Sequence, residues 1–474
     1  MASHHRFSDN YMVLRPENVS FFNIFGILLN NDLEKKAFVH YPSGKEENLP
    51  RNLRIFVSLF AQKLLQSLAN PTSKLGSRFE MWLNLVSCNR NSFLLLLNAL
   101  RGKVVMPVKE SRTFLSTLGF MDQRVHLDKN IKPGHCRYYS ALAVMAAKIS
   151  YENRAFVENV VRDHWKMELI GHFNFWNDFQ KKQTTKAIMF HDRSANSDII
   201  VVAFRGTEPF DTDAWCTDFD ISWYELHDMG KIHGGFMKAL GLLMYRGWPP
   251  PEEFEQDDHS STPLAYYTIR KLLVELLKQN ERTKYILTGH SLGGALAILF
   301  VAVLAMHEQT ELLERLEGVY TFGQPRVGDE GFKKFMESKL QAYNIKYLRF
   351  VYCNDVVPRM PFDNSRFSFK HFGTCIYYDS KYKGQVLEEE PDKNYFSPFG
   401  AIPRFVNAVW ELLRSFVLPC VKGAEYSEGW FLKMIRWYGL ILPGLSAHNP
   451  QDYVNLTRLG SDSLYLQLQQ QESV

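Results

Sequence analysis

One serine of this 474-residue chain stands between two apolar segments, in the stretch GHSLG. Gly289 and Gly293 flank Ser291 at G-x-S-x-G spacing. The residues before it, KYILTG (284–289), predict a buried strand, and the apolar residues 295–306 predict a buried helix. So tight a turn from strand to helix strains the backbone of the central residue and presents its side chain at the helix N-terminus. Ser291 is therefore a candidate nucleophile.

A serine nucleophile needs a histidine to accept its proton and a carboxylate to orient that histidine. In a strand–turn–helix arrangement of this kind the carboxylate follows the serine along the chain, on a loop after a strand. The segment IKYLRFVY (345–352) predicts a strand and runs directly into Cys353-Asn354-Asp355, so Asp355 is the candidate. Its competitors are Asp329, Asp363 and Asp379. Asp329 is better explained as the cap of a following helix.

The candidate base is His448, which lies in the segment PGLSAHNPQDYV (443–454). The prolines and the glycine around it predict a loop that can hold an imidazole over the serine. His371, in FSFKHFGTCIYY, alternates with apolar residues as in a strand, which favours a packed or solvated histidine. His290, next to the serine, is expected to pack under the turn.

The negative oxygen of an acyl-transfer intermediate needs hydrogen-bond donors. One candidate is the backbone N–H of Leu292, at the start of the predicted helix. The other is Thr207 in AFRGTE (203–208), a loop after a predicted strand, where the N–H and the hydroxyl can both donate. The alternative is an ordinary glycine turn with a structural arginine. A Ser-His-Asp set with these donors supplies its own chemistry, so no metal and no cofactor are predicted.

The composition is that of a globular protein, with 46% hydrophobic and 22% charged residues. The net charge of +4 is too small to indicate nucleic acid as a partner, and no nucleic-acid-binding motif occurs. The six cysteines show no metal-ligand spacing and nothing that demands disulfides. The first apolar segment, 20–29, is a poor secretory signal and is too short to span a bilayer.

From residue 135 onward, helix-like and strand-like segments alternate, as they do in an α/β domain. The predicted strands are 197–206, 284–289, 318–323 and 345–352. Two segments interrupt this alternation. The Pro-rich, acidic segment 249–263 predicts an exposed loop, and 400–445 is a strongly apolar insertion that carries tryptophans.

Residues 1–130 differ in character from the rest of the chain. The segment 51–70 predicts a helix with an apolar face formed by Leu53, Phe56, Phe60 and Leu64 and flanked by Ile55 and Leu59. A second apolar block follows at 92–107, and residues 51–110 contain nine Lys or Arg against two Glu. A basic, amphipathic region of this kind is typical of a surface that lies on anionic lipid. The alternative is that these helices pack on the main domain with their Lys and Arg side chains solvated.

Several motifs together resemble those of the class 3 lipases, a fungal and plant family with the α/β-hydrolase fold. They are AFRGTE, KIHGGF (231–236), TGHSLGGALA (288–297), TFGQPRVGD (321–329) and NDVVPRMP (354–361). The resemblance covers about residues 135–455 and implies a mostly parallel central sheet with helices on both faces. It implies that Ser291 is the nucleophile and that Asp355 and His448 are its triad partners. It also implies that Thr207 and Leu292 form the oxyanion hole.

The resemblance also implies that residues 209–226 occupy the position of a lid. The aromatic residues suited to opening this lid against lipid are Phe210, Trp215, Phe219 and Trp223. The basic N-terminal region and the long apolar insertion resemble the plant oil-body triacylglycerol lipases, which work on lipid droplets. We therefore predict a lipid-associating region, 1–130, followed by a lipase domain, 131–474. The protein is expected to lie peripherally on the cytosolic face of the lipid-droplet surface.

The predicted function is a triacylglycerol lipase that hydrolyses acylglycerol esters through an acyl-enzyme. A phospholipase A1 or galactolipid acyl hydrolase of the same fold stays open, because the motifs do not separate these substrates. A non-catalytic, lipase-like scaffold is the third possibility. The complete Ser-Asp-His set with two oxyanion donors argues against the scaffold. The sequence does not determine the oligomeric state.

Overall fold

The computed structural model describes residues 10–29, 38–40, 49–177, 179–194, 198–242, 263–361, 369–393, 395 and 397–472. Most of the acidic loop predicted over 249–263 lies outside these ranges, and so does Asp363. Within the described ranges, no helix combines the length and the apolar character needed to cross a bilayer.

Eight strands form the central sheet: β3 (Glu168–Asn177), β4 (Lys182–Asp192), β5 (Ile199–Phe204), β8 (Lys284–His290), β9 (Leu316–Phe322), β10 (Lys346–Tyr352), β11 (Thr374–Tyr378) and β12 (Gly384–Leu387). Their spatial order is β12-β11-β10-β9-β8-β5-β4-β3. The strands from β11 to β5 are parallel to one another, and β12, β4 and β3 pair antiparallel at the edges. The four strands predicted from the sequence are confirmed as β5, β8, β9 and β10. All side chains of β5 are buried, as a strand covered on both faces requires.

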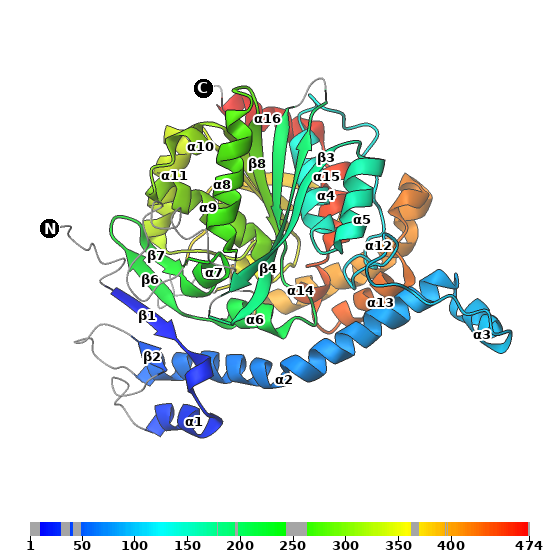
Figure 1. The fold of residues 1–474 in the computed structure, drawn as a ribbon, viewed down its shortest axis with the longest axis horizontal. Helices are drawn as coiled ribbons and strands as arrows, with labels where there is room; N and C mark the ends of the chain where they lie inside the picture. The colour runs from blue at the N-terminus through cyan, green and yellow to red at the C-terminus, as the bar shows by residue number, and fades with distance from the viewer. Residues whose placement is uncertain are drawn as a thin grey trace.

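Helices cover both faces of this sheet (Figure 1). One face packs against α7 (Gly234–Ala239), α8 (Ala265–Lys278), α9 (Leu292–Met306), α10 (Thr310–Glu314) and α11 (Glu330–Ala342). The other packs against α4 (Tyr138–Ile149), α5 (Arg154–Glu158), α15 (Pro450–Leu459) and α16 (Asp462–Glu472). Every residue of α9 from Leu292 to Ala305 is buried, which explains why its sequence is apolar on all sides. The predicted α/β-hydrolase arrangement is confirmed.

A helical N-terminal region joins this body through a second sheet. It comprises β1 (Asn10–Leu14), α1 (Phe21–Leu29), β2 (Val39–His40), α2 (Leu49–Cys88) and α3 (Ser92–Leu100). β1 pairs with β6 (Trp223–Leu226), which also pairs with β7 (Gly230–His233), so the sheet has the order β2-β1-β6-β7. Figure 1 shows α2 running along one edge of the body, with α1 below its first half and α3 beyond its end. The boundary near residue 130 stays a prediction.

The helix predicted over 51–70 is confirmed as part of α2, but its buried side differs from the predicted apolar face. Ile55 and Leu59 are fully buried in a small core with α1, β1 and β2. Leu53 and Leu64, predicted for the apolar face, are exposed. The spacing of apolar residues identifies a helix, but the position of α1 and β1 decides which apolar side chains become buried.

The apolar insertion 400–445 is helical and has an unusual distribution of side chains. It forms α12 (Ala401–Lys422), α13 (Trp430–Gly439) and α14 (Pro443–Ser446). The buried side of α12 carries Glu411 and Arg414, while its exposed side carries large apolar residues such as Phe405 and Phe416. The buried charges are paired: Arg414 donates to Asp452 on α15 at 2.7 Å. The insertion is therefore fixed to the body by ion pairs and turns apolar side chains outward.

Candidate active site

Ser291 lies at the turn between β8 and α9, and its backbone there is strained. Its φ is 58° and its ψ is −132°, a conformation that residues with a side chain rarely adopt. A Cβ atom on Gly289 would lie 2.1 Å from the carbonyl carbon of Gly293, and one on Gly293 would lie 2.2 Å from the oxygen of Phe204. The two glycines are thus required by close backbone packing, which is the physical basis of the G-x-S-x-G spacing.

His448 and Asp355, 93 residues apart in the chain, are joined by a hydrogen bond. The Nδ1 atom of His448 donates to Oδ2 of Asp355 at 2.7 Å. The Nε2 atom of His448 is buried and has no hydrogen-bond partner in the part of the chain that the structure describes. His448 and Ser291 line the same cavity. This arrangement leaves an imidazole nitrogen available to a hydroxyl group in that cavity.

Asp355 is fully buried and holds several hydrogen bonds besides the one from His448. Its Oδ1 accepts from the backbone N–H of Val357 at 2.9 Å, and its Oδ2 accepts from the hydroxyl of Tyr453 at 2.5 Å. The loop after His448 is fixed by Asn449, whose side chain caps α15. Both groups of the His448–Asp355 pair are therefore held from outside the pair.

His290 packs beneath the turn, as the sequence predicts. Its ring stacks on that of His448, with the ring centroids 4.4 Å apart and an interplanar angle of 28°. Its Nδ1 is hydrogen-bonded to the hydroxyl of Tyr151 at 2.9 Å. Burial, and then the nearby His448, lower the pKa of His290 well below its usual value. His290 is therefore a neutral ring that supports one face of His448.

Thr207 lies beside Ser291 because β5 and β8 are parallel neighbours, with Phe204 opposite Gly289. The loop that follows β5 is packed closely against the Ser291 turn, because a Cβ on Gly206 would lie 3.1 Å from the Cβ of Ser291. The hydroxyl of Thr207 donates to Oδ2 of Asp218 at 2.9 Å. Leu292 is the first residue of α9, so its backbone N–H is at the N-terminal end of that helix. The two predicted oxyanion residues therefore flank Ser291.

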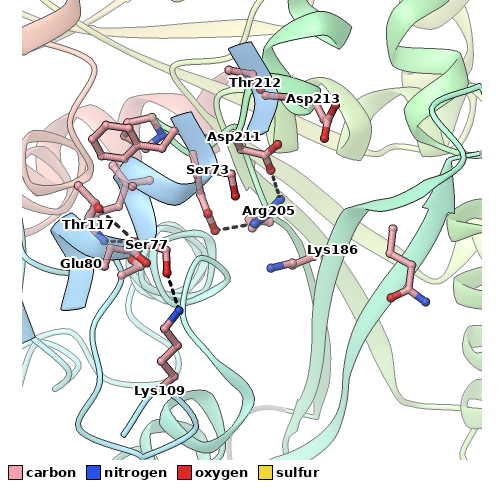
Figure 2. A pocket seen from close by; sticks show the side chains of 18 residues that line it. Ser73, Ser77, Glu80, Lys109, Thr117, Lys186, Arg205, Asp211, Thr212 and Asp213 are labelled. Carbon is pink, nitrogen blue, oxygen red and sulfur yellow. Dashed lines mark hydrogen bonds and ion pairs between the residues drawn. The ribbon is translucent and has the colours of Figure 1, made fainter. Parts of the chain in front are cut away.

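The base of the Thr207 loop is held by Arg205. Its guanidinium group donates to Glu208 and, at 3.0 Å, to Asp211. Asp211 in turn caps α6 (Thr212–Phe219) by accepting from Ala214 N–H. Arg205 and Lys186 also line a polar cavity of about 360 Å³. Figure 2 shows the side chains around this cavity. The loop and the start of α6 therefore form one hydrogen-bonded unit.

The cavity at Ser291 is larger, about 700 Å³, and mostly apolar. Its polar members include Ser291, His448, Thr207 and Asp218. The apolar lining comes from α2, α6 and the α13–α14 segment as well as from the central α/β body; examples are Val57, Phe219, Ile435, Val356 and Leu445. A cavity of this size and lining suits a hydrophobic ligand with one polar group.

Three of the four predicted lid residues lie in two elements, α6 and β6, and the fourth precedes α6. Trp215 and Phe219 lie in α6 and line the cavity. Phe210 precedes α6 and packs against Phe79 of α2, with ring centroids 5.9 Å apart. Trp223 lies in β6, where the Lys231 ammonium group is 4.7 Å from its ring centroid. The segment 209–226 thus contains a helix over the cavity followed by a sheet strand.

The competing residues have other surroundings. Asp329 caps α11 by accepting from Phe332 N–H, as predicted. Asp379 accepts from the N–H groups of Lys381 and Lys383 in a turn. His371 is buried and hydrogen-bonded to the Pro358 carbonyl at 2.7 Å. It precedes β11, so the strand suggested for it is wrong. Lys370 forms only an isolated bridge and the chain bends at Gly373, so the strand begins at Thr374.

One group of side chains has spacing suited to a metal ion. The ligand atoms of His135, Cys136 and Asp462 lie within 4.8 Å of one another. Asp462, however, already pairs with the guanidinium group of Arg137 at 2.6 Å, and none of these residues lines the cavity at Ser291. The group therefore has no part in the site described above.

The arrangement of these residues agrees with the similarity of the chain to known proteins. Residues 201–365 match the family model described as lipase (class 3). The chain is 40% identical to "Triacylglycerol lipase OBL1" of Nicotiana tabacum, over 96% of this chain and 95% of the relative. It is also 40% identical to the Arabidopsis thaliana protein of that name, over 96% of each chain. The chain belongs to the class 3 lipases. Among solved structures, this lipase resembles the Rhizomucor miehei lipase propeptide complex, with 25% identity, a TM-score of 0.40 and coverage of 56% of this chain and 76% of that one.

Three residues of the site in this lipase were not predicted from the sequence. Tyr453 and Asp218 contact predicted residues but lie in no local motif that indicates such a contact. Gly323 has a φ of +60°, and a Cβ there would lie 2.8 Å from Oδ2 of Asp355 and 2.9 Å from Cε1 of His448. The motif TFGQPRVGD contains this glycine, so its position in the motif was the available signal.

Proposed function

We propose that this serine ester hydrolase cleaves triacylglycerol at a lipid surface, with Ser291 as nucleophile. In this mechanism His448 Nε2 takes the proton of the Ser291 hydroxyl while its oxygen attacks the ester carbonyl. The N–H groups of Leu292 and Thr207 stabilise the negative oxygen of the tetrahedral intermediate. His448 then gives the proton to the leaving diacylglycerol oxygen, and Asp355 stabilises the imidazolium. Water attacks the acyl-enzyme in the same way and releases the fatty acid.

The observation that carries this proposal is the state of His448. One of its nitrogens is hydrogen-bonded to the buried carboxylate of Asp355, and the other is unpaired within the described residues. His448 also lines the same cavity as Ser291. A neutral imidazole in this state can accept a serine proton. The similarity to proteins named triacylglycerol lipases supports triacylglycerol as the substrate.

The test compares wild type and Ser291→Ala on emulsions of triolein and of phosphatidylcholine, following fatty-acid release. We expect release mainly from triolein, and a loss in the variant of at least about 10³-fold. Ser291-dependent release mainly from phosphatidylcholine would replace the proposal by a phospholipase A1 activity. Release that persists undiminished in Ser291→Ala would overturn the nucleophile assignment.

We further propose that the surface is that of lipid droplets, approached from the cytosol. Support comes from α12, which buries charged residues and exposes apolar ones. Its exposed large apolar residues are Ile402, Phe405, Val406, Trp410, Leu413, Phe416, Val417 and Val421. Water-exposed apolar side chains in this number are typical of an interaction with lipid or another apolar surface.

A second support comes from α3, an apolar helix in which no residue is buried. Leu100 is 78% exposed and Phe93 is 68% exposed. The exposed cations Arg90, Arg101 and Lys103 flank the helix. Figure 1 shows α3 standing apart from the body at the end of α2. An apolar helix flanked by cations is the composition that binds anionic lipid surfaces.

The droplet proposal is tested with the triple variant Phe93→Ser/Leu96→Ser/Leu100→Ser. These side chains are exposed, so the variant should fold, whereas deletion of residues 1–110 would also remove the pairing of β1 with β6. We expect reduced flotation with phospholipid-coated triolein droplets and unchanged hydrolysis of a soluble short-chain ester. Undiminished flotation would refute a lipid contact through α3.

A further inference from the structure

The N-terminal helix α2 contributes directly to the cavity at Ser291, although it lies far from the matched lipase segment 201–365 in sequence. Leu53, Val57 and Ser58 line this cavity together with Ser291 and His448. Residues 53 and 57 are one helical turn apart and therefore lie on the same face of α2. A wall of the substrate cavity is thus built from outside the family's matched segment.

The other side of α2 fixes its position. Ile55 and Leu59 are fully buried in the small core with Ile24 and Ile27 of α1. Because one face of the helix is held in this core, the face that carries Val57 is presented to the cavity. The two faces therefore have different roles, which cannot be read from the spacing of apolar residues along the helix.

Ser58 joins α2 to α6, the helix over the cavity. Its hydroxyl donates to the Phe219 carbonyl at 2.8 Å and accepts from the Ile221 N–H at 3.3 Å. Farther along, the Cys216 thiol lies 3.6 Å from the Gln62 carbonyl. The wall formed by α2 is therefore anchored to the segment that covers Ser291, and both line the same cavity.

We propose that the Leu53–Val57 face of α2 is a wall of the acyl-chain path and determines which acyl chains this lipase accepts. This inference rests on the proposed function, in which an ester carbonyl sits at Ser291. The acyl chain attached to that carbonyl needs an apolar path, and the lining from α2 and the α13–α14 segment is mostly apolar, although Arg54 of α2 also lines the cavity. Leu53 and Val57 are 53% and 55% exposed, so they lie where the cavity opens and a long chain leaves it.

Side-chain size at this wall should affect long chains and leave short ones unaffected. A butyryl group needs space only beside Ser291, whereas a palmitoyl group extends to the opening of the cavity. A larger side chain at the opening blocks the place of the distal carbons, which only the long chain has, so that chain loses its apolar contacts there. The expected signature is therefore a change in the ratio of the rates and not a uniform loss.

The experiment measures kcat/KM of the full chain for p-nitrophenyl butyrate and p-nitrophenyl palmitate in the same detergent micelles. For Val57→Trp we expect the palmitate-to-butyrate ratio to fall by roughly tenfold. The matched control is Leu68→Trp, eleven residues and hence about three turns along the same side of α2. Leu68 is 42% exposed and does not line the cavity. The control should keep the wild-type ratio.

An equal ratio in Val57→Trp and wild type, or an equal shift in Leu68→Trp, would overturn the inference. Val57→Ala provides an independent measurement if the tryptophan variant is inactive toward both esters. Val57→Ala should hydrolyse an ester with a branched acyl group faster than wild type does, relative to the butyrate ester. An unchanged ratio of these two rates in Val57→Ala would also overturn the inference. Failure of the proposed function is distinguishable, because Ser291→Ala would then hydrolyse the butyrate as fast as wild type.

Discussion

Thr207 and Asp218 are joined by a hydrogen bond of 2.9 Å, from the threonine hydroxyl to Oδ2 of the carboxylate. Thr207 follows β5 beside Ser291, and Asp218 is near the end of α6, the helix over the cavity. A hydroxyl has a single proton. While Asp218 is ionised that proton is committed to it, which leaves the backbone N–H as the proposed oxyanion donor of Thr207. One bond therefore connects the proposed oxyanion loop to the covering helix.

Asp218→Asn should alter how stability depends on pH. Burial raises the pKa of Asp218 to about 7, against the opposing effects of Thr207 and His448. An unfolded Asp titrates near pH 4, so between about pH 4 and pH 7 only the folded state holds this proton. The contribution of Asp218 to the free energy of unfolding therefore falls as the pH rises through this window, and is lowest above pH 7.

Because asparagine does not ionise, the variant should gain stability relative to wild type at pH 8 compared with pH 5. The expected gain is on the order of 1 kcal/mol. The measurement is the unfolding temperature of both proteins at the two pH values. A constant difference between the variant and wild type at both pH values would contradict the prediction.

Thr207→Val should lower kcat on a soluble ester by about tenfold or more. Without the hydrogen bond to Asp218, the loop that carries the Thr207 N–H is no longer held in place for the oxyanion. KM should change little, since the cavity is retained. Thr207→Ser is the matched control, because it keeps the hydroxyl, and its kcat should stay within about threefold of wild type. Steady-state kinetics decide the matter, and a fully active valine variant would show that the hydroxyl is dispensable.

Gly323→Ala should reduce kcat by about 100-fold and lower the unfolding temperature. The added methyl group would lie 2.8 Å from Oδ2 of Asp355 and 2.9 Å from Cε1 of His448, so it must displace the pair. Gly102→Ala controls for backbone strain, because its φ of +66° matches the +60° of Gly323 and nothing lies within 4 Å of the new atom. That control should lose about 1 kcal/mol of stability and keep its activity. Equal activity in the two variants would exclude the steric explanation.

Arg436→Met should destabilise the fold by about 3–5 kcal/mol. Arg436 of α13 is fully buried and donates to Glu428 at 2.8 Å and to Asp452 of α15 at 2.7 Å. Its removal leaves buried carboxylates without a cation. Urea denaturation measures the loss, and Arg436→Met/Glu428→Gln should recover part of it, because one of those carboxylates is then neutral. An unchanged midpoint in Arg436→Met would mean that these carboxylates do not need their cation.

Much of the fold could be predicted from the sequence because it is encoded locally. The strand, turn and helix around Ser291 follow from consecutive residues: β-branched and aromatic residues, closely spaced glycines, then an apolar run. The strands β5, β9 and β10 were recognisable for the same reason. By contrast β3, β4 and the sheet formed by β1, β2, β6 and β7 were not predicted. In that sheet β1 pairs with β6, which lies far along the chain, and such a pairing cannot be read from neighbouring residues.

The sequence by itself determined which residue types could do the chemistry and the strand–turn–helix that holds Ser291. Only the tertiary structure decided which histidine nitrogen meets which carboxylate, since His448 and Asp355 are 93 residues apart. The tertiary structure also turned the charged side of α12 inward and directed Leu53 and Val57 of α2 to the cavity at Ser291. The reason is physical. Backbone conformation depends mainly on neighbouring residues, whereas burial and contact depend on which distant surfaces pack together, and helical periodicity alone does not specify those partners.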